Sequence, residues 1–230
     1  MAIGLGRRDR RAVSLEEAAS GDADRCPACG EPLFAWVETQ GWGPREDQVV
    51  DRCENCGLAV ARDAVPSPEA AASVLLGEAP DQAEGDNLVV RAANAASLQA
   101  WLGAENWAAL RPGEFGLEPT PRAAELLLRR RGLEVTRIRH LPSKGMASMW
   151  QTLLNLLTFH RDFATEALSG RLRPGTGRGR GAFVIDALVT VLAAVPTALI
   201  AVLLEGAAVV ARRGGVIEIS ARPQPAGRSG

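Results

Sequence analysis

The feature that most constrains the fold of this chain is a matched set of cysteines. Cys26 and Cys29 form one pair with two residues between them, Cys53 and Cys56 form a second such pair, and the chain has no other cysteine. Two thiolates at this spacing can bind one tetrahedral metal ion from a tight turn, and the glycine after each pair permits the positive φ that closes the turn. The sequence therefore predicts a zinc ribbon with these four cysteines as ligands of a structural zinc ion.

The segment between the two pairs has the pattern of a β-hairpin. Residues 33–37 and 49–50 are apolar and flank a turn around residues 41–44, and residues 58–61 supply a third strand. Two disulfides are the alternative use of the same cysteines. The start of the chain is rich in arginine and leads into a polar helix start at residues 14–17, unlike a signal peptide, which favours a metal site over disulfides.

Composition sets wider limits on function. The chain has 230 residues, 47% of them hydrophobic, and a formal net charge of −1, so it can form one compact domain beside the ribbon. The predicted hairpin carries more acidic than basic residues, so nucleic acid is not an expected partner. A zinc ion held by four thiolates has no open coordination position for a substrate, so any catalytic chemistry must lie elsewhere.

Beyond the ribbon, capping residues mark two helices. Residues 67–77 begin with Ser-Pro and end with Gly, and residues 120–132 begin with Thr-Pro and end with Gly, which are the patterns of helix starts and stops. The predicted strands are residues 88–90, 133–138 and 216–220, and a further helix with an apolar face covers residues 146–159.

Several short motifs follow the ribbon in a fixed order. They are Asn94-x-x-Ser97 after a strand, a tryptophan-bearing loop, Thr120-Pro121 with Leu126-Leu127, Gly132-Leu133-Glu134-Val135, and the final Gly215 to Ile219. This order resembles the C-terminal half of class I S-adenosylmethionine methyltransferases that carry an N-terminal zinc ribbon. In that family the pieces are the fifth strand and its turn, a helix, the sixth strand and an antiparallel seventh strand. Ala93 departs from the pattern, because the family more often has proline there.

The resemblance implies a fold and a candidate pocket. The expected fold class is α+β or truncated α/β: a ribbon, then a small partial Rossmann-like sheet with a long helical, hydrophobic insertion before its last strand. Asn94, Ser97 and Trp107 would border the substrate pocket. The family binds S-adenosylmethionine with a glycine-rich turn after its first strand and an acidic residue after its second, and residues 57–87 have no room for both. The cofactor-binding half is therefore missing from this chain.

These expectations divide the chain into consecutive regions. The predicted regions are an N-terminal tail with a short helix (1–20), the zinc ribbon (21–64), a helix and linker (65–86), the methyltransferase-like half (87–222) with its hydrophobic insertion (146–212), and a flexible tail (223–230).

The most apolar part of the insertion raises the question of a membrane. Residues 187–204 are uncharged and long enough for a membrane span, and Pro196 at their centre favours a kinked helix or a helical hairpin over one straight helix. If strands 133–138 and 216–220 pair, the chain leaves and returns at one place, which excludes a single crossing. Three interpretations stay open: a buried helical cap on the sheet, a segment that dips into one leaflet, or a span without the strand pairing.

Arginines surround the apolar stretch on both sides. These arginines would suit contacts with anionic lipid headgroups, and they would equally suit a solvent-exposed border around a buried apolar stretch. The arginines are Arg171, Arg173, Arg178 and Arg180 before the stretch, and Arg212 and Arg213 after it.

Three functions are consistent with this sequence. The first is a zinc-binding, degenerate methyltransferase-like protein that acts as a non-catalytic scaffold or binding module, whose open sheet edge needs a second copy or a protein partner to cover it. The second is an S-adenosylmethionine-dependent methyltransferase that is active only with a partner or that uses an unconventional site. The third is a zinc-ribbon adaptor at a membrane surface. The expected location is the cytoplasm, with peripheral attachment to the inner face of the membrane in the third case.

Overall fold

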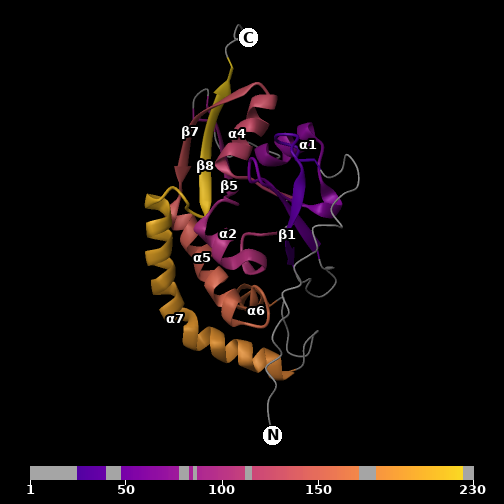
Figure 1. Ribbon diagram of the computed structural model, residues 1–230. Helices are drawn as coiled ribbons and strands as arrows, with labels where there is room; N and C mark the ends of the chain where they lie inside the picture. The colour runs from indigo at the N-terminus through magenta and orange to yellow at the C-terminus, as the bar shows by residue number, and fades with distance from the viewer. Residues whose placement is uncertain are drawn as a thin grey trace.

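The computed structural model describes residues 25–39, 48–77, 83–84, 87–111, 116–170 and 180–224. These residues form a mixed α and β structure with two four-stranded sheets, in which every pair of neighbouring strands is antiparallel (Figure 1). The predicted N-terminal helix, the hairpin turn, residues 171–179 before the apolar stretch and the last residues of the tail lie outside the described residues. The elements in chain order are β1 (Leu33–Thr39), β2 (Gln48–Cys53), β3 (Ala59–Ala61), η2 (Arg62–Ala64), α1 (Pro68–Leu76), β4 (Ala83–Glu84), β5 (Asn87–Ala93), α2 (Leu98–Gly103), η3 (Ala104–Asn106), β6 (Leu117–Glu118), α4 (Pro121–Arg130), β7 (Leu133–His140), α5 (Pro142–Leu157), α6 (Phe163–Leu168), α7 (Arg180–Val210) and β8 (Val216–Pro223).

The first sheet contains the ribbon, and its strand order is β1-β2-β3-β6. The hairpin of β1 and β2 and the third strand β3 confirm the strands predicted around the cysteines. The fourth strand, β6, was not predicted: it comes from far along the chain and pairs Leu117 with Val60. The ribbon sheet is thus extended by a strand from the second half of the protein.

The second sheet has the order β4-β5-β8-β7 and contains all three strands predicted after the ribbon. Strand β8 lies between β5 and β7 and is antiparallel to both, so β5 and β7 run in the same direction. The structure confirms the mixed α and β class and a helical insertion before the last strand. The described strands contain no parallel neighbours, which are characteristic of a Rossmann-like sheet.

The helices α1 and α4 start and stop where their capping residues predict. The side chain of Ser67 accepts a hydrogen bond from the Ala70 N–H, and Thr120 accepts one from the Ala123 N–H. Gly77 and Gly132, which follow the two helices, have φ angles of 70° and 71°. A side-chain acceptor at the first residue and a glycine with positive φ after the last residue satisfy helix ends locally, so these boundaries could be read from the sequence.

One hydrophobic core joins the ribbon to the second sheet. Its buried members include Cys53 and Leu58 of the ribbon, Leu127 of α4, and Ile217 and Ile219 of β8. The ribbon therefore does not have a core of its own, and its stability depends on that of the rest of the protein.

The insertion between β7 and β8 consists of α5, α6 and α7. Its two ends lie together, because the Leu141 N–H donates a hydrogen bond to the Val216 carbonyl at 2.9 Å. Helix α5 begins at Pro142, before the predicted start at 146, with proline in the first turn where a missing N–H costs little. Helix α7 runs along the outside of α5 and α6 and curves along its length (Figure 1).

Of the two forms predicted for the apolar stretch, a kinked helix or a helical hairpin, the structure has the single helix, because α7 continues through Pro196. A proline inside a helix leaves carbonyl groups of the preceding turn without their usual N–H donor. Two side chains bond carbonyl groups beside the proline: Thr197 Oγ1 of the same helix bonds the Ala193 carbonyl at 2.6 Å, and Trp150 Nε1 of α5 bonds the Ala194 carbonyl at 2.9 Å. The Trp150 bond is a tertiary contact that ties α5 to α7 at the bend.

Candidate functional site

The four cysteines lie together and could hold one metal ion. Their Sγ atoms are all within 4.8 Å of one another, and the Cys26–Cys56 and Cys29–Cys53 Sγ distances are both 3.4 Å. A tetrahedral ion with metal–sulfur bonds of about 2.3 Å holds its sulfurs about 3.8 Å apart. A disulfide needs about 2.05 Å, and all four cysteines are free thiols. The geometry fits a four-thiolate metal centre and not two disulfides.

The two turns that carry the cysteines have the same backbone hydrogen bonds. The Gly30 N–H bonds the Cys26 carbonyl, and the Gly57 N–H bonds the Cys53 carbonyl, both at 2.8 Å. The two glycines have φ angles of 79° and 76°, in the region that favours glycine. This confirms the conformational role that the sequence predicts for the glycine after each pair.

The protein stabilises a thiolate within the cluster. The hydrogen bond with Cys56 lowers the pKa of Cys26 to about 5, and the same bond raises the pKa of Cys56. The backbone N–H groups of Cys29 and Ala28 also hydrogen-bond to Cys26 and lower its pKa. Since the thiolate is the form that binds a metal, these N–H donors prepare the site for one.

Both ends of α4 hold the cysteine turns, which the sequence did not reveal. At its start, the hydroxyl of Thr120 donates a hydrogen bond to the Cys56 carbonyl while also capping the helix. At its end, Arg130 Nη2 donates to the Ala28 carbonyl at 3.4 Å. The metal centre is therefore attached to the helix that packs against the second sheet.

Two of the three residues predicted to border a substrate pocket hydrogen-bond in the turn after β5. Asn94 donates to the Gly214 carbonyl at 2.9 Å and accepts from the Ala96 N–H, and Ser97 is the N-cap of α2. Trp107 is 0% exposed, and its Nε1 has no hydrogen-bond partner among the described residues. Asn94 and Ser97 thus stabilise the turn, and the role of all three residues toward a substrate stays a prediction.

A buried histidine and aspartate pair joins α7 to the turn before α6. His160 Nδ1 lies 2.5 Å from Asp186 Oδ2, and the backbone N–H groups of Phe159 and His160 also donate to the Asp186 carboxylate. Both side chains are almost completely buried. The sequence gives no sign of this pair, because His160 lies in a turn and Asp186 in a helix that begins 20 residues later.

A second buried carboxylate holds the other half of α7. Glu205 is 0% exposed and accepts hydrogen bonds from Gln99 Nε2 at 2.7 Å and from the Gly215 N–H at 2.8 Å. Gln99 Nε2 also donates to the Gly145 carbonyl at 2.7 Å. This network connects α7 to α2, to the first turns of α5 and to the start of β8.

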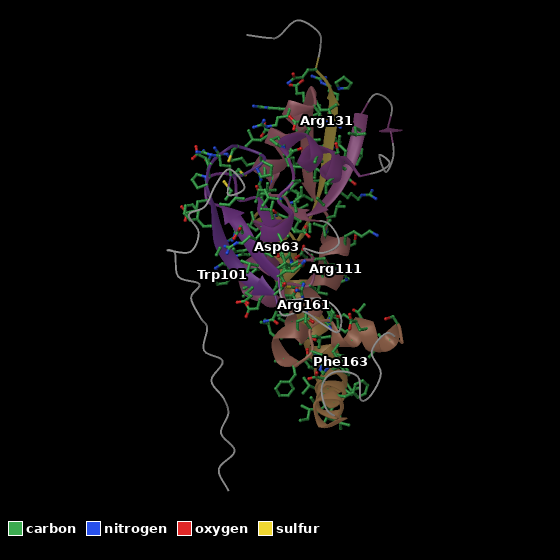
Figure 2. All side chains as sticks on the ribbon, turned by 90° about the vertical axis from the view of Figure 1, so that its right-hand side faces the viewer. Asp63, Trp101, Arg111, Arg131, Arg161 and Phe163 are labelled. Atoms are coloured by element: carbon green, nitrogen blue, oxygen red, sulfur yellow. The ribbon has the colours of Figure 1, made fainter. Side chains whose placement is uncertain are left out.

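A cavity of about 500 Å³ lies where the ribbon sheet, the second sheet and the helical insertion meet. Its walls include residues of α1, β5, β6 and α5 and of the turn that leads into α6. Arg111, one of the lining residues, is labelled in Figure 2 near Arg161, at the level where the strands adjoin the helices of the insertion. Asn94, Ser97 and Trp107 are not among its lining residues.

Similarity to known proteins does not assign a function to these features. No family model, no curated protein and no solved structure matches the chain. The functional conclusions therefore rest on the cysteine cluster, the buried carboxylates and the outer face of α7.

Proposed function

We propose that this chain is a peripheral membrane protein in which a zinc ribbon and a methyltransferase-like half-sheet form a non-catalytic scaffold. In this proposal α7 places the scaffold on an anionic membrane surface and leaves the ribbon available for a protein partner. The metal would be zinc, since four thiolates in tetrahedral geometry are its typical structural site. The single observation that carries the proposal is the polarity of α7, whose outer face is apolar and whose inner face holds the charges.

The outer face of α7 is a continuous apolar stripe. Its side chains recur every three or four residues, which places them on one side of a helix. Val191 and Leu203 are 74% and 73% exposed, and only 11% of the most apolar window of the helix is buried. A helix in a buried cap would be mostly covered. The exposed members of the stripe are Val184, Leu188, Val191, Leu192, Val195, Leu199, Val202 and Leu203.

The inner face of the same helix carries its polar groups. Asp186, Thr197 and Glu205 are buried against the protein, with the hydrogen bonds described above. Surface helices of proteins in water normally have the opposite arrangement, with apolar side chains inward and charges outward. An apolar outer face of this extent is typical of a surface that contacts lipid or another protein.

The anchoring of α7 favours an orientation parallel to the membrane. Asp186 and Glu205, near the two ends of the apolar stretch, are both bonded to the same globular body. Strands β7 and β8 pair next to the insertion, so the chain leaves and returns at one place. This pairing excludes a single crossing of the membrane by α7. A helix held at both ends on one side of a bilayer can insert its outer face to the depth of the headgroup and acyl boundary.

Charge at the ends of α7 selects a lipid surface over an apolar protein surface. Arg212 and Arg213, directly after the helix, are exposed, and the sequence before it has four arginines and no acidic residue between Arg171 and Arg180. Each basic residue near an anionic bilayer contributes about 1 kcal/mol of attraction. Apolar side chains between two basic ends therefore fit an anionic membrane.

Sedimentation with lipid vesicles tests this proposal. We expect the full chain to sediment with phosphatidylglycerol vesicles and much less with phosphatidylcholine vesicles. A triple variant, Val191→Gln, Val195→Gln and Leu199→Gln, should bind at least about a thousandfold more weakly, because each buried side chain of this kind contributes roughly 1.5 kcal/mol or more. Trp101→Gln, an exposed apolar position on α2, is the matched control and should bind like the wild type.

Two outcomes would contradict membrane attachment. A wild-type chain that stays in the supernatant with anionic vesicles would remove the proposal. A stable dimer in light scattering that dissociates in the triple variant would instead show that a second copy of the chain covers α7.

A second candidate function is a methyltransferase completed by a partner chain. It is supported by the arrangement of β5, β8 and β7, in which the last strand lies between two strands that run in the opposite direction. An antiparallel last strand is what the sequence resemblance implies for the end of a methyltransferase sheet. On the outer side of β5 the described partner is the two-residue strand β4, so most of that edge is open to a further strand from another chain.

Titration with S-adenosylmethionine distinguishes the two candidates. We expect isothermal titration calorimetry of the isolated chain to show no binding, because the glycine-rich turn and the ribose-binding acidic residue are missing. Micromolar binding by the chain alone would contradict the scaffold proposal. In that case an Asn94→Ala and Trp107→Ala double variant would test whether the predicted pocket residues take part in activity.

A further inference from the structure

One face of the second sheet is turned away from the core. Ile217 and Ile219 of β8 belong to the core that the sheet shares with the ribbon. Because neighbouring side chains of a strand point to opposite faces, Glu218 and Ser220 point to the other side. In Figure 1, α1 and α4 lie to the right of β8, on the core side, and the C-terminal part of α7 lies to its left. We call the side that carries Glu218 the open face of the sheet.

Three arginines share this open face. Arg91 of β5 and Arg139 of β7 both lie opposite Glu218 in the register of the strands. Arg137 of β7 lies opposite Ser220. Residues that lie opposite each other on paired strands point to the same side of a sheet, so these arginines stand in two adjacent rows across the open face.

Ion pairing neutralises only one of these arginines. Arg91 Nε lies 3.0 Å from Glu218 Oε2, which uses the carboxylate that stands between Arg91 and Arg139. Arg137 and Arg139 are exposed, and neither forms an ion pair with any described residue. Strand β7 therefore presents two uncompensated positive charges about 6.6 Å apart along the strand, given a rise of about 3.3 Å per residue.

The other charges of the sheet do not cancel this excess. Glu134 of β7 and Arg222 of β8 lie opposite each other and pair at 3.2 Å. Strand β4, which contains Glu84, is at the far edge of the sheet, with β5 and β8 between it and β7. The positive charge is thus concentrated at the edge that β7 forms.

This positive edge is continuous with the apolar outer face of α7. A Cβ atom on Gly214 would lie 2.9 Å from Val209 Cγ2 and 3.1 Å from His140 Cβ, so the end of α7 and the end of β7 are neighbours. Val210, the last residue of α7, is 87% exposed, and Arg212 is exposed without an ion pair among the described residues. A surface that covers the end of α7 would therefore also meet the arginines of β7.

An anionic bilayer matches this combination better than nucleic acid does. A bilayer presents phosphate groups directly beside acyl chains, as the protein presents arginines directly beside an apolar helix. Single-stranded nucleic acid also has phosphates, but its bases need aromatic side chains on which to stack, and β5, β7 and β8 contain no Phe, Trp or Tyr.

We propose that the open face at β7 is a second lipid-contact surface, on which Arg137 and Arg139 bind the phosphate groups of anionic headgroups while the apolar stripe of α7 inserts beside them. This inference rests on the membrane attachment proposed above and adds an orientation to it. The protein lies on the bilayer with β7 toward the lipid. The ribbon, on the core side of the sheet, faces away from the bilayer and stays accessible to a partner.

Vesicle sedimentation of two single variants tests this surface. We expect Arg137→Gln and Arg139→Gln each to bind phosphatidylglycerol vesicles roughly fivefold more weakly than the wild type, and the double variant about 25-fold more weakly, because each arginine near an anionic bilayer contributes an attraction of that size. The difference should shrink at high salt, which screens exposed charges. Arg122→Gln, which removes an exposed arginine of α4 on the core side, is the matched control and should bind like the wild type.

The outcomes separate this surface from the attachment of α7. If the wild type binds the vesicles and the triple variant of α7 does not, but both single variants bind like the wild type, this inference is wrong and the attachment through α7 stands. A wild type that stays in the supernatant removes both proposals.

Two further results would overturn the role of these arginines in lipid binding. Edge-strand charges can also serve to block pairing with another sheet. In that case the double variant should form dimers or aggregates in light scattering while its vesicle binding is unchanged. Binding of a single-stranded oligonucleotide that the double variant loses, with vesicle binding unchanged, would instead assign the surface to nucleic acid. Both substituted side chains are exposed, so the Tm of the double variant should equal that of the wild type.

Discussion

Removing the metal, or replacing Cys53 with serine, is expected to destabilise the whole protein and not the ribbon alone. Cys53 is 0% exposed and belongs to the hydrophobic core that also contains Leu127 and Ile219. Binding of structural zinc contributes on the order of 10 kcal/mol, as much as the entire free energy of unfolding of a typical domain, about 5–15 kcal/mol. Since the ribbon and the second sheet share one core, loss of the metal should lower the Tm by more than about 15 °C.

The measurement combines metal analysis with unfolding. Elemental analysis of the purified chain should find one zinc ion per molecule. Circular dichroism during heating should then show a single unfolding transition with and without a zinc chelator, and the chelator should move that transition to lower temperature. Glu54→Gln changes an exposed residue of the second cysteine turn that is not a ligand, and it should leave the Tm unchanged. Two separate transitions after chelation would show that the ribbon folds independently and would contradict the shared core.

The second large loss of stability is expected for the substitution Gly145→Ala in α5. A Cβ atom at this position would lie 1.9 Å from Glu205 Oε1 and 2.5 Å from Glu205 Cδ. The buried carboxylate would have to move away from the Gly215 N–H and from Gln99 Nε2, which would leave buried donors unpaired at about 1–3 kcal/mol each. We expect the free energy of unfolding to fall by about 2–5 kcal/mol, measured by urea denaturation.

Gly206→Ala is the matched control for this substitution. Gly206 is also helical, and a Cβ atom there would have no neighbour within 4 Å. Because alanine is the better helix former, this variant should gain about 0.5–1 kcal/mol. A double variant adds a second check: in a Glu205→Ala background the clash is gone, so Gly145→Ala should cost little. If its cost is unchanged in that background, the clash with Glu205 is not the cause.

Local signals explain why much of this fold could be predicted from the sequence. The cysteine pairs and their glycines fix two tight turns through backbone conformation and metal-ligand spacing, which depend on neighbouring residues only. The same is true of Ser67 and Thr120 at the starts of α1 and α4, whose side chains bond N–H groups three residues later. Three of the four strands of the second sheet, β5, β7 and β8, were predicted from short runs of apolar and β-branched residues, and the two-residue strand β4 was not.

Other parts of the fold depend on contacts between distant segments. Strand β6 is only two residues long, and it exists because Leu117 pairs with Val60 of the ribbon. Helix α7 continues through Pro196 as one helix, and Trp150 of a different helix bonds the Ala194 carbonyl beside the bend. Neither Val60 nor Trp150 can be inferred as a partner from local sequence. The sequence therefore left a kinked helix and a helical hairpin open for this segment, and the structure has the single helix.

The candidate sites also divide into one that local sequence predicts and one that depends on contacts between distant segments. The four cysteines were identified correctly as a cluster, since their spacing already brings each pair together. The cavity gave no signal in the sequence, because its walls come from α1, β5, β6 and α5, which only the folded chain brings together.

The matched cysteines and the apolar stretch were thus determined by the sequence alone, but their consequences were decided by tertiary structure. Packing joined the ribbon to a core shared with the second sheet, so a metal that the sequence assigns to one short motif is expected to stabilise the whole protein. The buried carboxylates of Asp186 and Glu205 fixed which side of α7 faces inward. The physical reason is that hydrophobicity along a sequence records how apolar a segment is, whereas only the hydrogen-bond partners of its polar residues determine which face remains exposed.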